Sequence, residues 1–392
     1  MDARPDMPSI LTVTTLFPNP VQPAHGAFVA ARLEKLLASG QITAEVLAPV
    51  PWLPPFLRHA SAGRLDQVPR ERIEQGLRIH HPRYLVVPKI GMTLTPHTLF
   101  RTLRHSLGKL LAEGQRFDLI DAHYFYPDGV AAVWLGRHFG IPVVVTARGT
   151  DLSLIPQYAA PRRMICDAAA QADGLITVCQ ALKDRLVELG VPPARVSVLR
   201  NGVDLERFSP ADREQARAAL GCRRRTLGSV GLLVERKGHH HVIRALAALP
   251  DTDLLIVGAG PERGFLERLA RSVGVADRVR FLGTLDQPQL ARVYNALDAL
   301  VLASSREGWA NVLLEAMACG TPVVASAVWG TPEVVTAPES GVLMPSLDPQ
   351  GVVTGVERLF AACPDRAATR RYAEKFSWEA TTDGQLRLFE TV

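Results

Sequence analysis

Short apolar runs alternate with amphipathic stretches along the 392 residues of the chain. Residues 9–17, 42–50, 172–178 and 299–302 are predicted strands, and the apolar run 299–302 is typical of a strand that is buried on both faces. Apolar positions at helical spacing follow in stretches such as 27–37. This pattern predicts an α/β protein, and the length is sufficient for two domains of ordinary size.

The stretch 299–326 has the clearest pattern, which predicts a strand, a turn, a helix and a second strand. Glu307 lies in the turn and Glu315 lies two helical turns later, so both carboxylates can face one crevice. The helix amino end near Gly308 favours a phosphate. Carboxylates beside a phosphate site are expected to accept hydrogen bonds from neutral hydroxyls, and a sugar nucleotide has both features. The alternative is a solvated turn carboxylate and a second one on an exposed helix face.

The residues Glu307, Glu315 and the following Ala-Met-Ala-Cys-Gly-Thr-Pro-Val-Val-Ala-Ser resemble the signature of the retaining GT-B glycosyltransferases of family 4, also called group 1. Within that family, the teichuronic-acid-biosynthesis branch is the most similar. The resemblance implies two facing Rossmann-like domains with parallel sheets and a donor in the cleft between them. It implies an acceptor-side domain over residues 1–204, a donor-binding domain over 205–375, and a final helix, 376–392, that crosses back to the first domain.

The loop before residue 238 supplies adjacent cations, Arg236 and Lys237, that can neutralise a diphosphate. The resemblance implies a donor site made of Gly26, Arg236, Lys237, Gly260, Gly283, Gly308, Trp309, Ala310, Asn311 and Glu315. Leu232 stands where the family commonly has an arginine, and Arg236 or Arg200 is the candidate substitute. This departure keeps open a non-catalytic subunit that only binds a sugar nucleotide.

The first domain has polar residues at the carboxyl ends of predicted strands. By resemblance, His123 lies near the transferred sugar and Gly26 lies near the diphosphate, with His25 beside it. The segment Arg148-Gly-Thr-Asp matches one in which the family commonly begins with histidine. Arg148, Thr150, Asp151, Arg200 and Asn201 are therefore further candidates. The alternative for His123 alone is a turn histidine whose hydrogen bonds are all made within the protein.

The implied reaction moves a sugar from a nucleoside diphosphate to an acceptor hydroxyl with retention of configuration. Glu307, His123 and Lys237 are the expected catalytic residues, and the leaving phosphate is expected to accept the acceptor's proton. A UDP-sugar is the first expectation for the donor and a GDP-sugar the second; a lipid-linked glycan or a polysaccharide is expected as acceptor. A sugar-nucleotide epimerase or a phosphorylase on the same fold remains an alternative.

No essential metal or other cofactor is expected, because no Asp-x-Asp motif follows a predicted strand and cations can replace a divalent ion. The tract from His239 to His241 is a poor metal site, since consecutive helical side chains point in different directions. Nucleic acid is not an expected partner, because the chain carries no motif for it.

Charge and apolar loops bear on localisation. The net charge is +5, and residues 51–110 hold ten Arg or Lys against three Asp or Glu. Trp52, Leu53, Phe56 and Leu57 are apolar neighbours of this basic region, which suits shallow contact with an anionic bilayer. The alternative is a loop packed on its own domain. Five dispersed cysteines, no apparent signal peptide and no apolar run of membrane-spanning length predict a cytoplasmic protein, or one peripheral to the inner face of the membrane.

Overall fold

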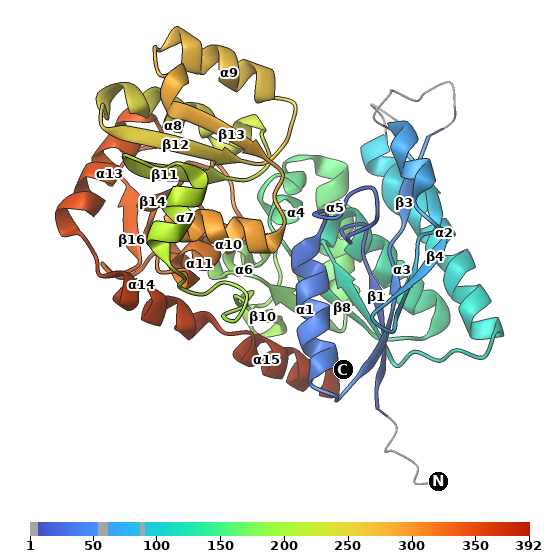
Figure 1. Ribbon diagram of the computed structural model, residues 1–392. Coiled ribbons are helices and arrows are strands. Elements are labelled where there is room, and N and C mark those ends of the chain that lie inside the picture. The colour runs from blue at the N-terminus through green and yellow to red at the C-terminus, as the bar shows by residue number, and fades with distance from the viewer. Residues whose placement is uncertain (1–6, 54–61, 87–90) are drawn as a thin grey trace. The chain divides into compact units, whose positions relative to one another are not determined.

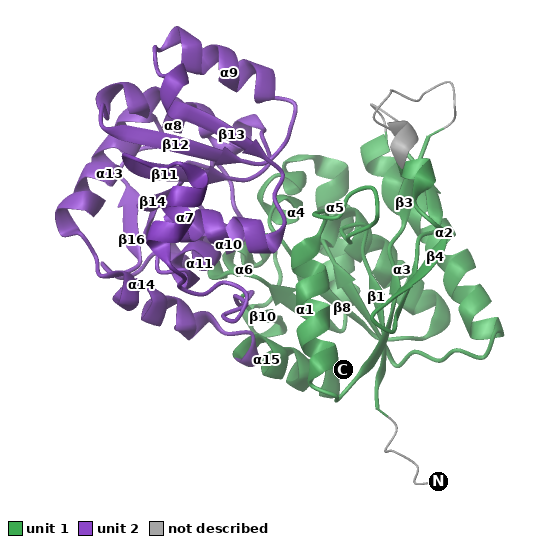
Figure 2. Cartoon of the chain, in the orientation of Figure 1, with its two compact units in different colours: residues 1–200, 380–392 green, residues 201–379 purple. Residues whose placement is uncertain are grey.

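The computed structural model describes residues 7–53, 62–86 and 91–392. The chain forms two compact units (Figure 2). Unit 1 consists of residues 1–200 and 380–392, and unit 2 of residues 201–379. The division falls four residues before the expected domain boundary. The last thirteen residues, 380–392, belong to unit 1, whereas the predicted crossover helix begins at residue 376.

Unit 1 is built on an eight-stranded sheet that is parallel except for the β4–β5 pair at one edge. The strand order is β10 (Val196–Val198), β9 (Gly174–Thr177), β8 (Val143–Ala147), β7 (Leu119–His123), β1 (Ser9–Val13), β2 (Thr43–Leu47), β5 (Leu77–His80) and β4 (Glu71–Glu74). The chain reverses its direction of strand addition between β1 and β7. A separate parallel pair joins β3 (Val50–Trp52) to β6 (Arg83–Leu85).

Helices cover this sheet (Figure 1). They are α1 (Ala27–Ala38), α2 (Gly91–Ala112), α3 (Val130–Phe139), α4 (Thr150–Ser153), α5 (Ala159–Gln171), α6 (Gln180–Glu188) and α15 (Glu379–Glu390). In α1, the buried residues Val29, Leu33 and Leu36 recur at helical spacing and face the sheet core. The sequence pattern of 27–37 is therefore confirmed as a helix.

Unit 2 contains a six-stranded sheet in which every pair is parallel. The order is β13 (Val279–Gly283), β12 (Thr252–Val257), β11 (Arg225–Val230), β14 (Ala299–Leu302), β15 (Val323–Ser326) and β16 (Gly341–Met344). This is the doubly wound order of a Rossmann-like sheet, with its switch point between β11 and β14. The expected fold class, two Rossmann-like domains with parallel sheets, is confirmed.

The helices of unit 2 are α7 (Arg213–Leu220), α8 (His239–Ala245), α9 (Arg263–Ser272), α10 (Gln287–Ala296), α11 (Asn311–Ala318), α12 (Thr331–Val334), α13 (Pro349–Ala362) and α14 (Arg366–Ala373). Leu254, Ile256 and Val301 on the strands pack with Val242 of α8 and Val356 of α13, and all are fully buried. Burial of each such side chain contributes about 1.5–3 kcal/mol to the stability of the folded unit. This packing holds the strands, and the loops that follow them, in place.

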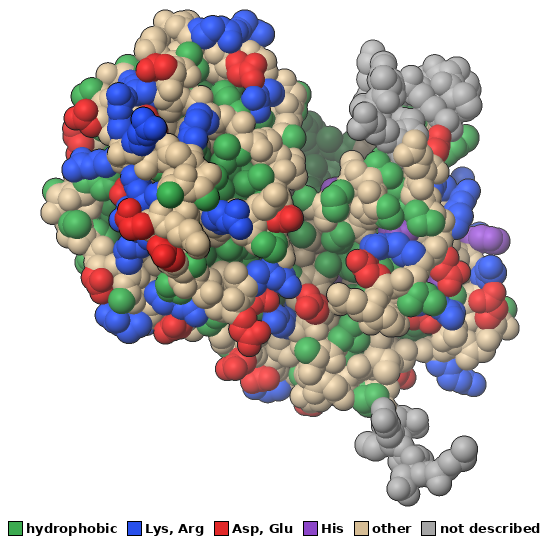
Figure 3. Space-filling model, in the orientation of Figure 1, with side chains coloured by type: hydrophobic (Ala, Val, Ile, Leu, Met, Phe, Trp, Pro, Cys, Tyr) green, Lys and Arg blue, Asp and Glu red, His purple; other side chains and the backbone are tan. Residues whose placement is uncertain are grey.

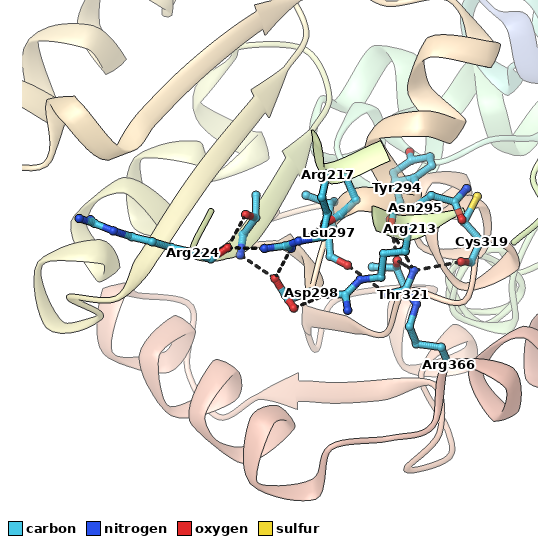
Figure 4. Close-up of polar contacts among 12 residues, drawn as sticks. Arg213, Arg217, Arg224, Tyr294, Asn295, Leu297, Asp298, Cys319, Thr321 and Arg366 are labelled. Carbon is cyan, nitrogen blue, oxygen red and sulfur yellow. Dashed lines mark hydrogen bonds and ion pairs between the residues drawn. The ribbon is translucent and has the colours of Figure 1, made fainter. Parts of the chain in front are cut away.

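A polar cluster anchors the helices of unit 2 near the amino end of β14 (Figure 4). Asp298 pairs with Arg213 at 2.6 Å and with Arg217 at 3.0 Å. Arg366 donates to the carbonyl oxygens of Asn295, Leu297 and Cys319 and to the Thr321 hydroxyl. These arginines make structural contacts within unit 2. They also lie at the amino end of a strand, whereas ligands of open α/β sheets bind at the carboxyl ends.

The surface carries mixed charge and some exposed apolar side chains. On the face shown in Figure 3, basic and acidic side chains are interspersed over both units. Trp52, Leu85, Met92 and Leu94 are 36–46% exposed. Trp52 pairs with Leu85 in the small sheet, and Met92 and Leu94 begin α2. Phe56 and Leu57, also expected at a membrane surface, lie outside the described residues. No helix among those described is long and apolar enough to cross a bilayer.

Candidate active site

Two loops meet at the switch point of the unit 2 sheet. Residues 231–238 follow β11 and residues 303–310 follow β14. The Ser305 amide donates to the Arg236 carbonyl at 2.8 Å. Gly238 has a φ of +68°, and a Cβ there would lie 1.8 Å from the Ala303 carbonyl oxygen. Only glycine permits this close approach, so the backbone brings the two predicted loops together.

Lys237 and Glu307 form an ion pair across these loops. Lys237 Nζ lies 2.5 Å from Glu307 Oε1, and the two side chains are 14% and 9% exposed. A half-buried charge needs a partner, and each residue supplies it to the other. The structure therefore brings together two of the three residues predicted to be catalytic. They present a cation and a carboxylate at the edge where a doubly wound sheet binds its ligand.

The other residues of the first loop have different surroundings. Arg236 is half-buried, and within the described part of the chain its side chain forms no ion pair. Leu232, which replaces the arginine common in the family, is 59% exposed. Its carbonyl oxygen lies 3.2 Å from His239 Nε2. Lys237 is thus paired with Glu307, whereas Arg236 is the neighbouring cation without a carboxylate partner among those residues.

Glu315 lies in α11 and accepts a hydrogen bond from the Tyr294 hydroxyl at 2.8 Å through Oε2. Part of its surface stays accessible, although protein surrounds most of the carboxyl. Burial raises the pKa of Glu315 to about 7, and the Tyr294 hydrogen bond opposes this rise. The carboxyl therefore changes its protonation state near neutral pH, and Oε1 is the oxygen that does not accept from Tyr294.

The turn before α11 is held by Trp309. Its indole N–H donates to the Asn201 carbonyl at 2.9 Å, and its ring packs beside Phe376. The Asn201 amide donates to Asn311 at 3.4 Å. The Trp309 side chain is buried in these contacts. The predicted contribution of Gly308, Trp309 and Ala310 to the donor site would therefore come from their backbone groups at the start of α11.

The predicted glycines are required mainly by the fold. A Cβ at Gly260 would lie within 2.4–2.8 Å of the Leu233 backbone. Gly283 has a φ of +72° and open space at its Cβ position, and its carbonyl accepts from Gly258. Their predicted donor contacts stay predictions.

The histidine tract is occupied by protein contacts. His239 is buried, with Nδ1 2.8 Å from the Ser229 hydroxyl, and the ring centres of His240 and His241 lie 4.0 Å apart with their planes tilted by 44°. Throughout the described ranges, no group of three or more His, Cys, Asp or Glu is arranged to hold a metal ion.

In unit 1, His123 lies at the carboxyl end of β7 with both ring nitrogens engaged. Nε2 is 3.0 Å from Asp121 Oδ2, and Nδ1 is 2.7 Å from an Arg148 guanidinium nitrogen. Arg148 can only donate, so Nδ1 accepts and Nε2 carries the proton. Burial lowers the pKa of His123 to about 4, against the opposing effect of Asp121. His123 is therefore a neutral imidazole, and both of its ring nitrogens bond to protein groups. These contacts are those of the alternative considered above, a turn histidine whose hydrogen bonds are all made within the protein.

The chain of contacts continues from Asp121 to the last helix. Gln385 of α15 donates to Asp121 Oδ2 at 2.9 Å, and Arg32 of α1 donates to Gln385 Oε1 at 2.5 Å. Asp121, His123, Arg32 and Gln385 are 0–1% exposed. We call this chain, with Arg148, the buried relay. It joins α1, β7, the end of β8 and α15.

The segment after β8 is shaped by Asp151. Its carboxylate accepts from the amides of Phe125 at 2.7 Å and Gly149 at 2.6 Å, and from that of Arg148. Asp151 is fully buried, whereas Thr150 beside it begins α4 and is partly exposed. Asp151 therefore fixes the turn that carries Arg148.

Asp128 is a buried residue that the sequence interpretation did not select. Its Oδ2 accepts from the Thr15 amide at 2.7 Å and the Thr15 hydroxyl at 2.9 Å, at the unit 1 switch point between β1 and β7. Burial raises the pKa of Asp128 to about 7, although the bonds from Thr15 lower it. The turn sequence Tyr-Pro-Asp-Gly, which follows β7, is the signal that could have led to this position.

His25 and Gly26 support the same edge. His25 Nε2 lies 3.0 Å from the Thr15 carbonyl oxygen. Gly26 has a φ of +68°, and a Cβ there would lie 2.2 Å from the Leu16 backbone. The glycine is thus required by the protein's own backbone. Arg200 is exposed at the end of unit 1.

The sequence analysis also did not select four buried polar residues: Arg32, Asp121, Tyr294 and Gln385. Each is a polar side chain in a regular helix or strand, and no local pattern in the sequence marks it for burial. Their partners lie up to 353 positions away in the sequence.

Comparison with known families agrees with this geometry. The model of "Glycosyl transferases group 1" matches residues 212–376, and that of "Glycosyltransferase Family 4" matches residues 27–207. D-inositol 3-phosphate glycosyltransferase of Actinosynnema mirum is 33% identical over 378 residues, which cover 88% of this chain and 85% of that protein. The chain belongs to the group 1 glycosyltransferases.

Other members of the family align over a smaller part of their length. The protein of the same name from Mycolicibacterium gilvum is 36% identical over 290 residues, 69% of this chain and 65% of the relative. That from Mycobacterium marinum is 34% identical, over 70% and 63%. The match thus spans slightly less than two thirds of these two relatives.

Solved structures show the same GT-B fold. Sucrose-phosphate synthase from Thermosynechococcus elongatus has a TM-score of 0.80 at 22% identity, with 98% of both chains covered. Anabaena Alr3699/HepE in complex with UDP has a TM-score of 0.73 at 19% identity, covering 98% of this chain and all of that one. The resemblance to group 1 enzymes is confirmed, and no comparison bears on the teichuronic-acid branch.

Proposed function

We propose that this group 1 glycosyltransferase transfers a sugar from a nucleoside-diphosphate sugar to an acceptor hydroxyl, with retention of configuration. The observation that carries the proposal is the Lys237–Glu307 pair, which joins the two switch-point loops of unit 2. A diphosphate is the natural partner of the lysine, and sugar hydroxyls are natural partners of the carboxylate. A donor that carries both groups can separate the pair and satisfy each half.

We propose a UDP-sugar as the donor, with a GDP-sugar as the second choice. Support for UDP comes from HepE, whose structures contain UDP or UDP-glucose. For the acceptor, the curated relatives' name makes D-inositol 3-phosphate the first compound to test. A lipid-linked glycan or a polysaccharide is the second.

Each residue of the unit 2 site has a role in the proposed reaction. Lys237 and Arg236 stabilise the departing diphosphate, together with the backbone amides at the start of α11. Glu307 orients the sugar hydroxyls, and Glu315 accepts from the ribose through Oε1, the oxygen that is not bonded to Tyr294. The bond between the anomeric carbon and the phosphate oxygen breaks while the bond to the acceptor oxygen forms. The released phosphate oxygen accepts the acceptor's proton on the same face of the sugar.

Thermal unfolding with UDP, GDP, ADP and CMP, each with and without magnesium, tests the donor. A ligand at 100 times its dissociation constant adds about 2.7 kcal/mol. This is a shift of several degrees for a unit of this size. A shift with UDP that magnesium does not change supports the proposal that cationic side chains replace a metal. No shift with any nucleotide would contradict donor binding and favour loss of function through Leu232.

A transfer assay tests the chemistry. UDP-glucose and a panel of other UDP-sugars are incubated with D-inositol 3-phosphate, and UDP release and the anomeric configuration of the product are measured. An axial product from an axial donor supports retention. An equatorial product would contradict it, and release of UDP without any transfer would contradict these acceptors.

We also propose that the enzyme contacts an anionic membrane surface. The side chains Trp52, Leu85, Met92 and Leu94 support this, because they are exposed and lie in the basic region 51–110. Apolar anchors next to cations suit shallow insertion at a lipid headgroup layer.

A further inference from the structure

The buried relay has features that packing alone does not require. It runs from Arg32 through Gln385, Asp121 and His123 to Arg148, with successive contacts of 2.5, 2.9, 3.0 and 2.7 Å. An apolar cluster of similar volume would stabilise a core at least as well as buried ions do. The cost of burying two arginines and a carboxylate therefore calls for a function.

Gln385 connects Arg32 to the rest of the buried relay. Its carbonyl oxygen accepts from a cation and its amide nitrogen donates to an anion, so its orientation is fixed by both neighbours. It therefore connects Arg32 to Asp121 through its own side chain. Asp121 consequently keeps its Oδ2 oriented toward His123 Nε2, and this contact sets the tautomer of the ring together with the Arg148 donor at Nδ1.

Arg148 is the member of the relay with the largest exposed fraction. It is 8% exposed, whereas the other four members are 0–1% exposed. It follows β8 at the carboxyl edge of the sheet, beside the switch point, and its guanidinium lies 5.4 Å from the centre of the Phe28 ring. Burial lowers the pKa of Arg148 well below its ordinary value, and Asp121 and Asp151 oppose that change. A guanidinium is nevertheless practically never deprotonated in proteins, so Arg148 stays a cation.

We propose that Gln385 is a positioning residue of this enzyme: through Asp121 and His123 it holds the Arg148 guanidinium in place to bind an anionic group of the acceptor. A phosphate or a carboxylate on the acceptor has the required chemistry, since both match a planar guanidinium. The C-terminal helix thereby takes part in acceptor binding without touching the acceptor. This inference rests on the proposed glycosyl transfer, because the bound anion is a group of its acceptor, whereas the state of the relay itself can be measured without transfer.

The first test is spectroscopic and needs no activity. The ring nitrogen shifts of His123, assigned by comparison with His123→Asn, report its tautomer and protonation between pH 4 and 8. Wild type should show a neutral ring with the proton on Nε2 down to about pH 5. Gln385→Met has similar length and cannot form either hydrogen bond, so it should show mixed tautomers. An unchanged tautomer in Gln385→Met would overturn the proposal.

Gln385→Glu is a second variant, in case Gln385→Met does not fold. Its carboxylate still accepts from Arg32 but adds a negative charge beside Asp121. The charged groups that face the ring are Asp121 on β7, Arg148 after β8 and Arg32 on α1, while Asp151 anchors the Arg148 turn. The extra negative charge favours the imidazolium, so the pH at which His123 gains its proton should rise by at least one unit. No change would overturn the relay.

The kinetic test separates acceptor binding from donor binding. Gln385→Met should raise the KM for a phosphorylated acceptor at least tenfold and leave UDP affinity within about twofold of wild type. Asp383→Ala, an exposed position on the same helix, is the matched control and should leave both unchanged. Equal losses with anionic and neutral acceptors would contradict an anion-binding Arg148. If wild type transfers no sugar, the proposed function fails, whereas the tautomer measurement still decides the relay.

Discussion

The carboxyl edges of the two sheets handle charge in different ways. In unit 1 the polar residues behind the edge are almost fully covered, and each is bonded to another part of the protein. In unit 2 the side chains of the Lys237–Glu307 pair are 14% and 9% exposed, and in the proposed function a sugar-nucleotide donor replaces each partner. The contacts in unit 1 fix the positions of the side chains, whereas the proposed role of the unit 2 ion pair requires it to separate when the donor binds. The proposed transfer requires both features: fixed side chains that hold one substrate, and an ion pair that separates and re-forms as the other substrate binds and leaves.

The largest effect is expected when the unit 2 ion pair loses its cation. Lys237→Ala should lower turnover about 100- to 1,000-fold, because it removes a charge that stabilises the departing diphosphate. UDP affinity, measured by titration calorimetry, should also fall. Lys109→Ala, an exposed lysine on α2, is the control and should retain full activity. Near-normal turnover of Lys237→Ala would place the reaction elsewhere.

Glu307→Gln sharpens the comparison by separating the two halves of the pair. It keeps the size of the side chain but removes the charge that competes for Lys237. Turnover should fall by at least tenfold, while UDP should bind as tightly as in wild type or more tightly, because no ion pair has to be broken. Weaker UDP binding would mean that Glu307 only positions Lys237.

Donor binding should depend on pH through Glu315. Its pKa is raised to about 7 by burial, so the carboxylate that accepts from ribose is lost as the pH falls through 7. UDP-glucose affinity should decrease about tenfold from pH 8 to pH 6. Glu315→Gln should show a flatter profile under the same titration. Parallel profiles for the two proteins would assign the pH dependence to another group.

Asp128 should make a pH-dependent contribution to stability. Its folded pKa of about 7 is above the ordinary value, so the folded state binds the proton more tightly. Its stabilising contribution is complete below about pH 4 and is lost as the pH rises through 7. Asp128→Asn should lose less stability than wild type between pH 5 and 8, as measured by urea unfolding. An identical loss in both would contradict the raised pKa.

The smallest effect concerns the apolar surface of unit 1. Leu94→Ser together with Trp52→Ser should reduce co-sedimentation with vesicles rich in phosphatidylglycerol several-fold, without changing UDP binding. Neutral phosphatidylcholine vesicles are the control, because the proposal requires anionic lipid. Equal binding of wild type and the variant would favour an apolar surface that serves the fold.

The sequence by itself determined the local units and the family. Apolar runs of strand length, helical spacing and the signature from Glu307 to Ser326 were sufficient for two Rossmann-like domains and for the positions of Lys237, Glu307 and Glu315. These features are predictable because strand and helix periodicity are local, and because ligand loops follow strands at fixed places.

The tertiary structure alone decided which of these residues meet. Lys237 and Glu307 are 70 positions apart, and they pair because β14 lies next to β11. Arg32 and Gln385 are 353 positions apart, and no local pattern marks either as a partner of Asp121. The histidine chosen as catalytic proved to be enclosed by protein groups, and Trp309 proved to be an anchor for Asn201. Long-range hydrogen bonds depend on strand order and helix docking, and these depend on the packing of the whole chain.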